Sequence, residues 1–247
     1  MSQLSDLIED LVAANRILAH ENVVDAFGHV SVRHPTDANR YFLSRARSPA
    51  LIEADDIMQF MMDGTPIDPP AGHAPYIERY IHSGLYEARP DIQSVVHSHS
   101  RAVVPFGVGG ETIRPMLHNC APIGAHVPIW DSRTKFGDTD LLVSSLAMGR
   151  DLAGFMENCP SALLRGHGSV AAARSLRLAV YIAIALQTSA ELQAQTSRYE
   201  SVVFLSPGEI EKGSVMLNAP PGKPQFSLER AWEYWCHRAG VPFRAQI

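Results

Sequence analysis

Two histidines, His97 and His99, are separated by one residue within the apolar run "SVVHSHSRAVVPFGV" (94–108), which predicts a buried strand. Alternate side chains of a strand project from the same face, so both imidazoles can reach one divalent cation about 2 Å from each ring nitrogen. His167, between two glycines in "LLRGHGSV", offers a third ligand after another apolar strand. Three imidazoles leave coordination positions open, as a catalytic site requires. From these residues alone, hydrogen-bonded core histidines are an equal alternative.

Glu78 is the candidate proton-transfer group beside this predicted metal site. It lies in "PYIERYIHSGLY", a predicted helix in which Ile77 and Ile81 belong to the buried side, so we expect the carboxylate at the inner edge of the sheet. A carboxylate near a metal can carry a proton between substrate atoms. The local sequence favours the alternative, a solvated glutamate paired with His82 one helical turn later.

The elements that position these residues alternate between helices and strands, and several strands are joined by turns of two to four residues. Such short turns imply antiparallel pairing, so we expect an α/β fold with a mixed, mainly antiparallel sheet and helices on its faces, in one domain over residues 1–247. The helices are predicted over 3–20, 75–90, 139–157, 176–201 and 227–240. The strands are predicted over 28–35, 40–46, 57–62, 92–100 and 125–130, with a strand, turn and strand over 161–173.

Composition limits the classes of partner. The 247 residues are 46% hydrophobic and 19% charged with a net charge of −5, and the absence of a Lys/Arg block argues against nucleic acid and anionic membranes as main partners. The amphipathic start is not typical of a signal peptide, so we expect a cytoplasmic protein. Cys120, Cys159 and Cys236 form no CxxC pair, which predicts buried thiols and no disulfide framework.

Four stretches in this order resemble the class II aldolase/adducin family: "GHVSVR" (28–33), Glu78, "VVHSHS" (95–100) and "LLRGHG" (163–168). The resemblance implies an α/β/α sandwich and a C4 homotetramer with active sites between adjacent subunits. It also implies that His97, His99 and His167 bind one divalent cation, Mn²⁺ or Zn²⁺, and that Glu78 is the catalytic acid/base.

Departures from the sugar-phosphate aldolases of this family concern the residues that cradle phosphate. The family's Asn is His29 here, its Thr-Gly pair is Ala46 and Arg47, and its paired serines are Tyr76 and Ile77. A phosphate needs several converging donors, and most of them are missing. The aldolases' tyrosine acid, which comes from a neighbouring subunit, matches Asn119 in "MLHNCAP"; the preceding His118 is a weaker candidate proton donor.

The replacing residues resemble the branch of the family that decarboxylates hydroxylated aromatic or pyridine dicarboxylates. "FLSRARSPALI" (42–52) contains two arginines, whose planar forks match a carboxylate; a pair of solvated loop charges is an equal alternative. The implied reaction is 4-decarboxylation of 3-hydroxy-2-methylpyridine-4,5-dicarboxylate, a step of vitamin B6 degradation, or decarboxylation of 3,4-dihydroxyphthalate, with the cation stabilising enolate-like charge. The candidate substrate-binding residues are Arg45, Arg47, Ser31 and His29, with Trp130 and Phe136 as a ring wall or as ordinary core aromatics.

Two other functions remain open. One is a class II aldolase or epimerase acting on a sugar phosphate, which Asn at position 29 and serines at 76 and 77 would have favoured. The other is a non-catalytic, adducin-like interaction module, which the three histidines argue against because those relatives usually lack them.

Overall fold

A computed structural model describes residues 3–215 and 226–245. Its centre is an eight-stranded sheet with the strand order β4-β3-β2-β1-β5-β8-β7-β6, in which only β6 and β7 pair in parallel. The strands are β1 (His29–Arg33), β2 (Arg40–Ser44), β3 (Ile57–Met61), β4 (Pro66–Ile67), β5 (Ser94–Ser98), β6 (Ile129–Trp130), β7 (Ser161–Leu164) and β8 (Gly168–Ala173).

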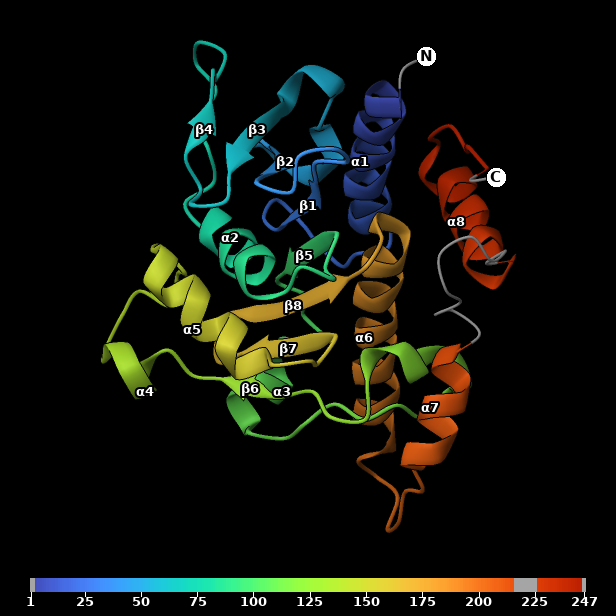
Figure 1. Ribbon diagram of the computed structural model, residues 1–247. Helices are drawn as coiled ribbons and strands as arrows, with labels where there is room; N and C mark the ends of the chain where they lie inside the picture. Colours follow the sequence, from blue (N-terminus) through green and yellow to red (C-terminus); the bar gives the residue numbers. More distant parts are fainter. Residues whose placement is uncertain (1–2, 216–225, 246–247) are drawn as a thin grey trace.

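Helices cover both faces of the sheet (Figure 1). The helices are α1 (Gln3–His20), α2 (Arg79–Ala88), α3 (Val104–Gly109), α4 (Arg133–Phe136), α5 (Leu146–Met156), α6 (Leu176–Thr196), α7 (Pro207–Val215) and α8 (Phe226–Ala239), with 3-10 turns at Pro49–Leu51, Ala54–Asp56 and His118–Ile123. Helices α1, α6 and α8 bury their apolar sides in one core, and α2 and α5 bury theirs in a second. The expected α/β/α sandwich with a mainly antiparallel sheet is therefore confirmed.

Successive side chains of each strand point alternately into the two cores on either side of the sheet. In β5, Val96 belongs to the α1/α6 core, whereas its neighbour Val95 belongs to the α2/α5 core. Because side chains two residues apart share a face, His97 projects with Val95 toward α2. Its partner across the ladder, His29 of β1, lies on the same face.

Helices α2 and α5 cross at two glycines. A Cβ atom on Gly84 would lie 2.2 Å from the carbonyl carbon of Gly149, and one on Gly149 would lie 2.0 Å from the Tyr80 carbonyl oxygen. Any larger residue would therefore push the helices apart. The close crossing brings the N-terminal end of α2 next to the segment that leads into α5.

The structure shortens one predicted strand and adds helices. The run over 94–108 is not one strand: β5 ends at Ser98 and α3 begins at Val104, where Pro105 stands in the first turn and needs no hydrogen-bond partner for its nitrogen. Helices α3, α4 and α7 were not expected. Among the described helices, none combines the length and the apolar composition that a bilayer crossing needs. The expectation of one domain over 1–247 stays a prediction.

Candidate metal centre

The two histidines of the HxH pair occupy different structural positions. His97 is the fully buried fourth residue of β5, and His99 lies one residue beyond the strand end, half-buried. The expectation that both belong to the strand is corrected by this position. Their Nε2 atoms nevertheless lie 3.0 Å apart.

His167 reaches the same point from the hairpin between β7 and β8. Leu164 pairs with Gly168 across the hairpin, and Gly166 adopts φ +68°, a left-handed conformation typical of a three-residue loop. A Cβ on Gly168 would lie 2.0 Å from the Ser98 carbonyl oxygen, so only glycine allows the hairpin to approach β5 so closely. The approach puts His167 Nε2 2.9 Å from His99 Nε2.

The protons available on the three rings do not explain these contacts. The Ser169 carbonyl accepts from His97 Nδ1 at 3.1 Å, so Nε2 of a neutral His97 carries the lone pair. His99 Nε2 would have to donate to His97, and the one proton on that nitrogen cannot also serve its contact with His167. No assignment of neutral tautomers gives each contact its own proton. A shared cation satisfies all three nitrogens, and ligand atoms of a tetrahedral zinc ion lie about 3.3 Å apart.

Glu78 completes the cluster. One oxygen, Oε2, lies 3.5 Å from His97 Nε2 and 3.4 Å from His167 Nε2, and the other, Oε1, accepts a hydrogen bond from the Val143 backbone at 3.0 Å. The four candidate ligand atoms lie within 4.8 Å of one another. A donor set of three imidazoles and one carboxylate suits zinc or manganese.

The position of Glu78 differs in detail from the expectation. Helix α2 begins at Arg79, so Glu78 precedes its first turn, and Ile77 is 57% exposed instead of buried. Glu78 also makes no pair with His82. The carboxylate still lies at the inner edge of the sheet, as expected. The reason differs from the expected one: the N-terminal end of α2 points at β5.

Electrostatics favour an ionised Glu78 carboxylate and an unprotonated His99 ring. Burial alone would raise the pKa of Glu78, but the adjacent His97 and His167 rings hold it well below its usual range. Burial, together with the His97 ring, lowers the pKa of His99 to about 4. At neutral pH the His99 nitrogen therefore keeps its lone pair for a metal.

A second pair of histidines lies beside the cluster. His29 Nδ1 is 2.7 Å from His82 Nε2, and the Ser31 hydroxyl lies between His82 Nδ1 at 2.6 Å and the Tyr86 hydroxyl at 2.7 Å. Burial, together with the nearby His97 ring, lowers the pKa of His82 to about 3. Ser31 is fully buried beneath His82, and its predicted contact with substrate stays a prediction. The sequence offered no signal for this use of His82.

Arg45 and Arg47 share one buried acid. Arg45 Nε lies 2.5 Å from Asp56 Oδ1, and Arg47 NH1 lies 2.7 Å from Asp56 Oδ2. Burial alone would raise the pKa of Asp56, but its bonds to both arginines lower it to about 2. The two guanidiniums therefore fix the loop over 45–56, and their predicted contact with substrate stays a prediction.

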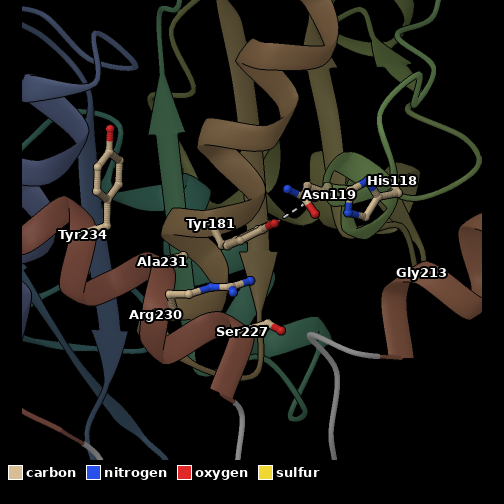
Figure 2. A pocket seen from close by; sticks show the side chains of 8 residues that line it. All are labelled: His118, Asn119, Tyr181, Gly213, Ser227, Arg230, Ala231 and Tyr234. Atoms are coloured by element: carbon tan, nitrogen blue, oxygen red, sulfur yellow. Dashed lines mark hydrogen bonds between the residues drawn. The ribbon is translucent and has the colours of Figure 1, made fainter.

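His118 lies elsewhere in the chain. It lines a pocket of about 430 Å³ with Asn119, Tyr181 and residues of α7 and α8, and it is not part of the histidine cluster. Figure 2 shows the Tyr181 hydroxyl donating to the Asn119 carbonyl in this pocket, at 3.0 Å. Within one chain His118 does not join Glu78, so its predicted role would need a neighbouring subunit.

A cleft of about 540 Å³ opens beside His99. Its lining includes Asn22, Val23, Asp25, Ser48, His99 and Arg101. Trp130, expected as a possible wall for a flat ring, instead lies in the α2/α5 core and donates to Asp151 at 2.9 Å, and Phe136 packs against that same core. The sequence singled out neither this cleft nor Arg101.

Comparisons with known proteins agree with the fold and identify the family. A profile described as the Class II Aldolase and Adducin N-terminal domain matches residues 9–194. The protein named decarboxylase tropJ from Talaromyces stipitatus is 33% identical over 253 aligned residues, which cover 92% of each chain. The 3,4-dihydroxyphthalate decarboxylase of Arthrobacter keyseri is 30% identical, and the alignment covers 92% of this chain and 91% of that protein.

Solved structures share the fold at lower identity. An aldolase II superfamily protein from Pseudomonas syringae superposes with a TM-score of 0.78 at 22% identity, over 97% of this chain and 94% of the other. An L-fuculose 1-phosphate aldolase from Glaciozyma antarctica PI12 gives 0.74 at 22% identity, over 98% and 92%. With a family profile matched over more than half of its length and relatives at 30% identity or more, the chain belongs to the class II aldolase and adducin family.

Proposed function

We propose that the protein is a divalent-metal-dependent decarboxylase of an ortho-hydroxy aromatic or pyridine dicarboxylate. The observation that carries the proposal is the convergence of three imidazole nitrogens and the Glu78 carboxylate at the edge of an open cleft. Two relatives that align with 92% of the chain are named as decarboxylases, which supports this reaction over other chemistry of the family.

In the proposed site, His97, His99 and His167 hold the cation, Mn²⁺ or Zn²⁺. The bound ion supplies Lewis acidity that stabilises negative charge developing on the substrate. The Ser169 carbonyl fixes the tautomer and orientation of His97, as backbone acceptors do around metal sites. The cleft beside His99 receives the ring and excludes part of the solvent.

Glu78 moves the proton in this proposal. As the carbon–carbon bond breaks, CO₂ leaves and its bonding electrons stay on the ring carbon, which then needs one proton. The Glu78 carboxylate can accept the proton of the ring hydroxyl and return it to that carbon, directly or through one water, while solvent restores the hydroxyl on release. Its bond from Val143 holds the carboxylate in place for both transfers.

The arginines of the 45–56 loop and His29 remain proposed substrate contacts. Arg47 and Arg45 keep N–H groups that Asp56 does not use, and such a group can bind a second carboxylate. Arg47→Ala is expected to raise KM for a dicarboxylate far more than for its monocarboxylate analogue. An equal effect on both would limit the arginines to holding the loop.

We also infer a homotetramer with sites between subunits, because His118 can serve a proton transfer only from a neighbouring chain. Light scattering on the purified protein measures the mass. A monomer that is active at all protein concentrations would remove His118 from the mechanism.

Metal analysis combined with a CO₂-release screen tests the proposed function. The substrates are 3-hydroxy-2-methylpyridine-4,5-dicarboxylate and 3,4-dihydroxyphthalate, with L-fuculose 1-phosphate as the aldol control. We expect one Mn²⁺ or Zn²⁺ per chain and CO₂ release from a dicarboxylate. Cleavage of the sugar phosphate without CO₂ release would establish an aldolase, and no turnover by the metal-loaded protein would favour an interaction module.

A further inference from the structure

We propose that Arg101 is a further anchor for the second substrate carboxylate, in addition to the contacts proposed for Arg45 and Arg47, so that the cleft beside His99 selects aromatic acids with an anionic group besides the group at the metal. The proposal rests on the proposed function and names the residue that sets its specificity.

Arg101 lies in the cleft and forms no ion pair with a described acidic side chain. It follows His99 by two residues, lines the same cleft and is exposed. Of the acidic side chains in the described ranges, none lies within ion-pair distance of its guanidinium, whereas Arg45 and Arg47 both bind Asp56. A free guanidinium beside a metal centre is the group that an anionic substrate would contact.

The one acid among the described cleft residues does not neutralise Arg101. Asp25 Oδ1 accepts a hydrogen bond from the Phe27 backbone at 3.0 Å, so this carboxylate caps its own loop. The Asp25 carbonyl also accepts from the Ser48 hydroxyl, at 3.5 Å, which links the two loops that form the cleft wall. The Asp25 carboxylate keeps its charge but forms no ion pair with Arg101, so the guanidinium can pair with a ligand.

The turn that carries Arg101 is held by buried polar contacts. Ser100 donates to Gln187 Oε1 at 2.7 Å, and Gln187 Nε2 donates to the Glu21 carbonyl at 2.8 Å. Gln187 on α6 thus connects the turn over 99–101 with the loop that follows α1, two walls of the same cleft. Because the backbone of the turn is already fixed, ligand binding restricts only the arginine side chain, which lowers the entropic cost of binding.

Apolar groups of the cleft suit a flat ring between metal and arginine. Val23, Val24, Ala26 and Ala50 line the cleft. The adjacent Phe27 is 64% exposed, and its ring centroid is 6.2 Å from that of His99. An arginine fork binds a carboxylate through two parallel hydrogen bonds, so the cleft would orient a ring acid by its second carboxylate.

Binding of two non-reacting probes tests the assignment. Phthalate carries two adjacent carboxylates and benzoate one, and neither has the hydroxyl that the proposed decarboxylation requires. Calorimetry on the metal-loaded protein is expected to give tighter binding of phthalate. Arg101→Gln should weaken phthalate about 10- to 100-fold and benzoate less than about 2-fold, because a charge-assisted contact is lost from only one ligand.

Two variants and one assay complete the experiment. Arg101→Lys should give an intermediate loss, and Arg150→Gln is the matched control, an exposed arginine on another face whose partner is the exposed Glu87. The metal content of Arg101→Gln should equal that of the wild type. Equal losses for both probes, loss of metal, or no phthalate preference in the wild type would overturn the assignment.

The same samples distinguish this inference from the proposed function. With 3,4-dihydroxyphthalate and 2,3-dihydroxybenzoate, Arg101→Gln should raise KM selectively for the first, which has the additional carboxylate. A wild type that prefers phthalate but releases no CO₂ would contradict the decarboxylase and keep the Arg101 assignment. CO₂ release with an unchanged probe preference in Arg101→Gln would overturn only the assignment.

Discussion

Two clusters of buried polar side chains in this protein are built in opposite ways. In the first, Arg177 is 1% exposed and lies 2.5 Å from Glu229 and 3.2 Å from Asp10, so opposite charges face one another. Its NH2 group also donates to the Arg244 carbonyl at 2.6 Å. In the second, the histidine cluster, three imidazole nitrogens and one carboxylate oxygen converge on one point. Each of these atoms can accept a proton or bind a cation.

The difference separates a structural cluster from a functional one. The Arg177 cluster joins α6 to α1, α8 and the C-terminal segment, and its guanidinium pairs with two carboxylates of the same chain. In the histidine cluster no arrangement of protons on neutral rings serves every contact, whereas a bound cation would. A buried polar cluster that its own protons cannot satisfy therefore indicates a ligand, whereas a balanced one indicates stability.

The largest expected effect is loss of the metal. His97→Ala and His99→Ala should each reduce metal content from one ion per chain to less than about a tenth and reduce turnover to background, because each removes an imidazole ligand. Inductively coupled plasma mass spectrometry measures the metal. His237→Ala, which removes an exposed histidine of α8, should keep it. Full metal content in either cluster variant would make the comparison between the two clusters wrong.

The variant Glu78→Gln tests whether Glu78 is needed for metal binding or only for proton transfer. The amide preserves the shape and can accept from Val143, so the ion should stay at one per chain. Turnover should fall about 100- to 10,000-fold, as for loss of a positioned acid/base. Metal content and CO₂ release are measured on one preparation. A variant with wild-type turnover would remove Glu78 from the mechanism.

Arg177→Met tests the balanced cluster. The substitution removes the buried guanidinium that Asp10 and Glu229 share, which should lower the free energy of unfolding by about 3 to 5 kcal/mol. For a chain of this size the melting temperature would fall by roughly 10 °C. Metal content should be unchanged. Arg150→Met is the exposed control, and equal melting temperatures for both variants would contradict a structural role for Arg177.

The same contrast explains what the sequence could predict. Apolar periodicity located α1, α2, α5, α6 and α8, because burial of one face repeats at fixed spacing along the chain. The histidine cluster was only half accessible, because the local residues left a metal site and core histidines as equal alternatives until the family resemblance favoured the metal site. The strand alternation used for the pair also fails at His99, which lies beyond the end of β5. Helix α3 was missed because an apolar run has the same composition in a buried strand and in a short helix.

Residues whose role depends on distant partners could not be predicted. Arg45 and Arg47 were expected to bind a substrate carboxylate, and only the fold shows that both bind Asp56. Ser31 was expected near the substrate, and only the fold shows that His82 of α2 covers it. Arg101 is the converse case, since only the fold shows that no described acid reaches it. Local sequence gives residue types, whereas charge balance is a property of the assembled fold.

The smallest predicted effect is a pH dependence of the free energy of unfolding. It is expected from His82, beside the histidine cluster, and not from the Arg177 cluster. Buried His82 has a folded pKa of about 3, and in the unfolded chain the value is about 6.5. The unfolded state therefore binds the proton first as pH falls, so the stability that neutral His82 contributes is complete above pH 6.5 and decreases below it.

Between pH 7.5 and pH 5.5, His82 should account for a loss of about 1.4 kcal/mol in the free energy of unfolding of the metal-free protein. Urea unfolding at the two pH values measures it. His82→Gln should reduce the difference by that amount, whereas Arg150→Gln should keep it. If His82→Gln keeps the full pH dependence, His82 is not held neutral between His29 and Ser31. The pH sensitivity of the fold would then have to come from other groups, such as His29 and His99, whose pKa values burial also lowers.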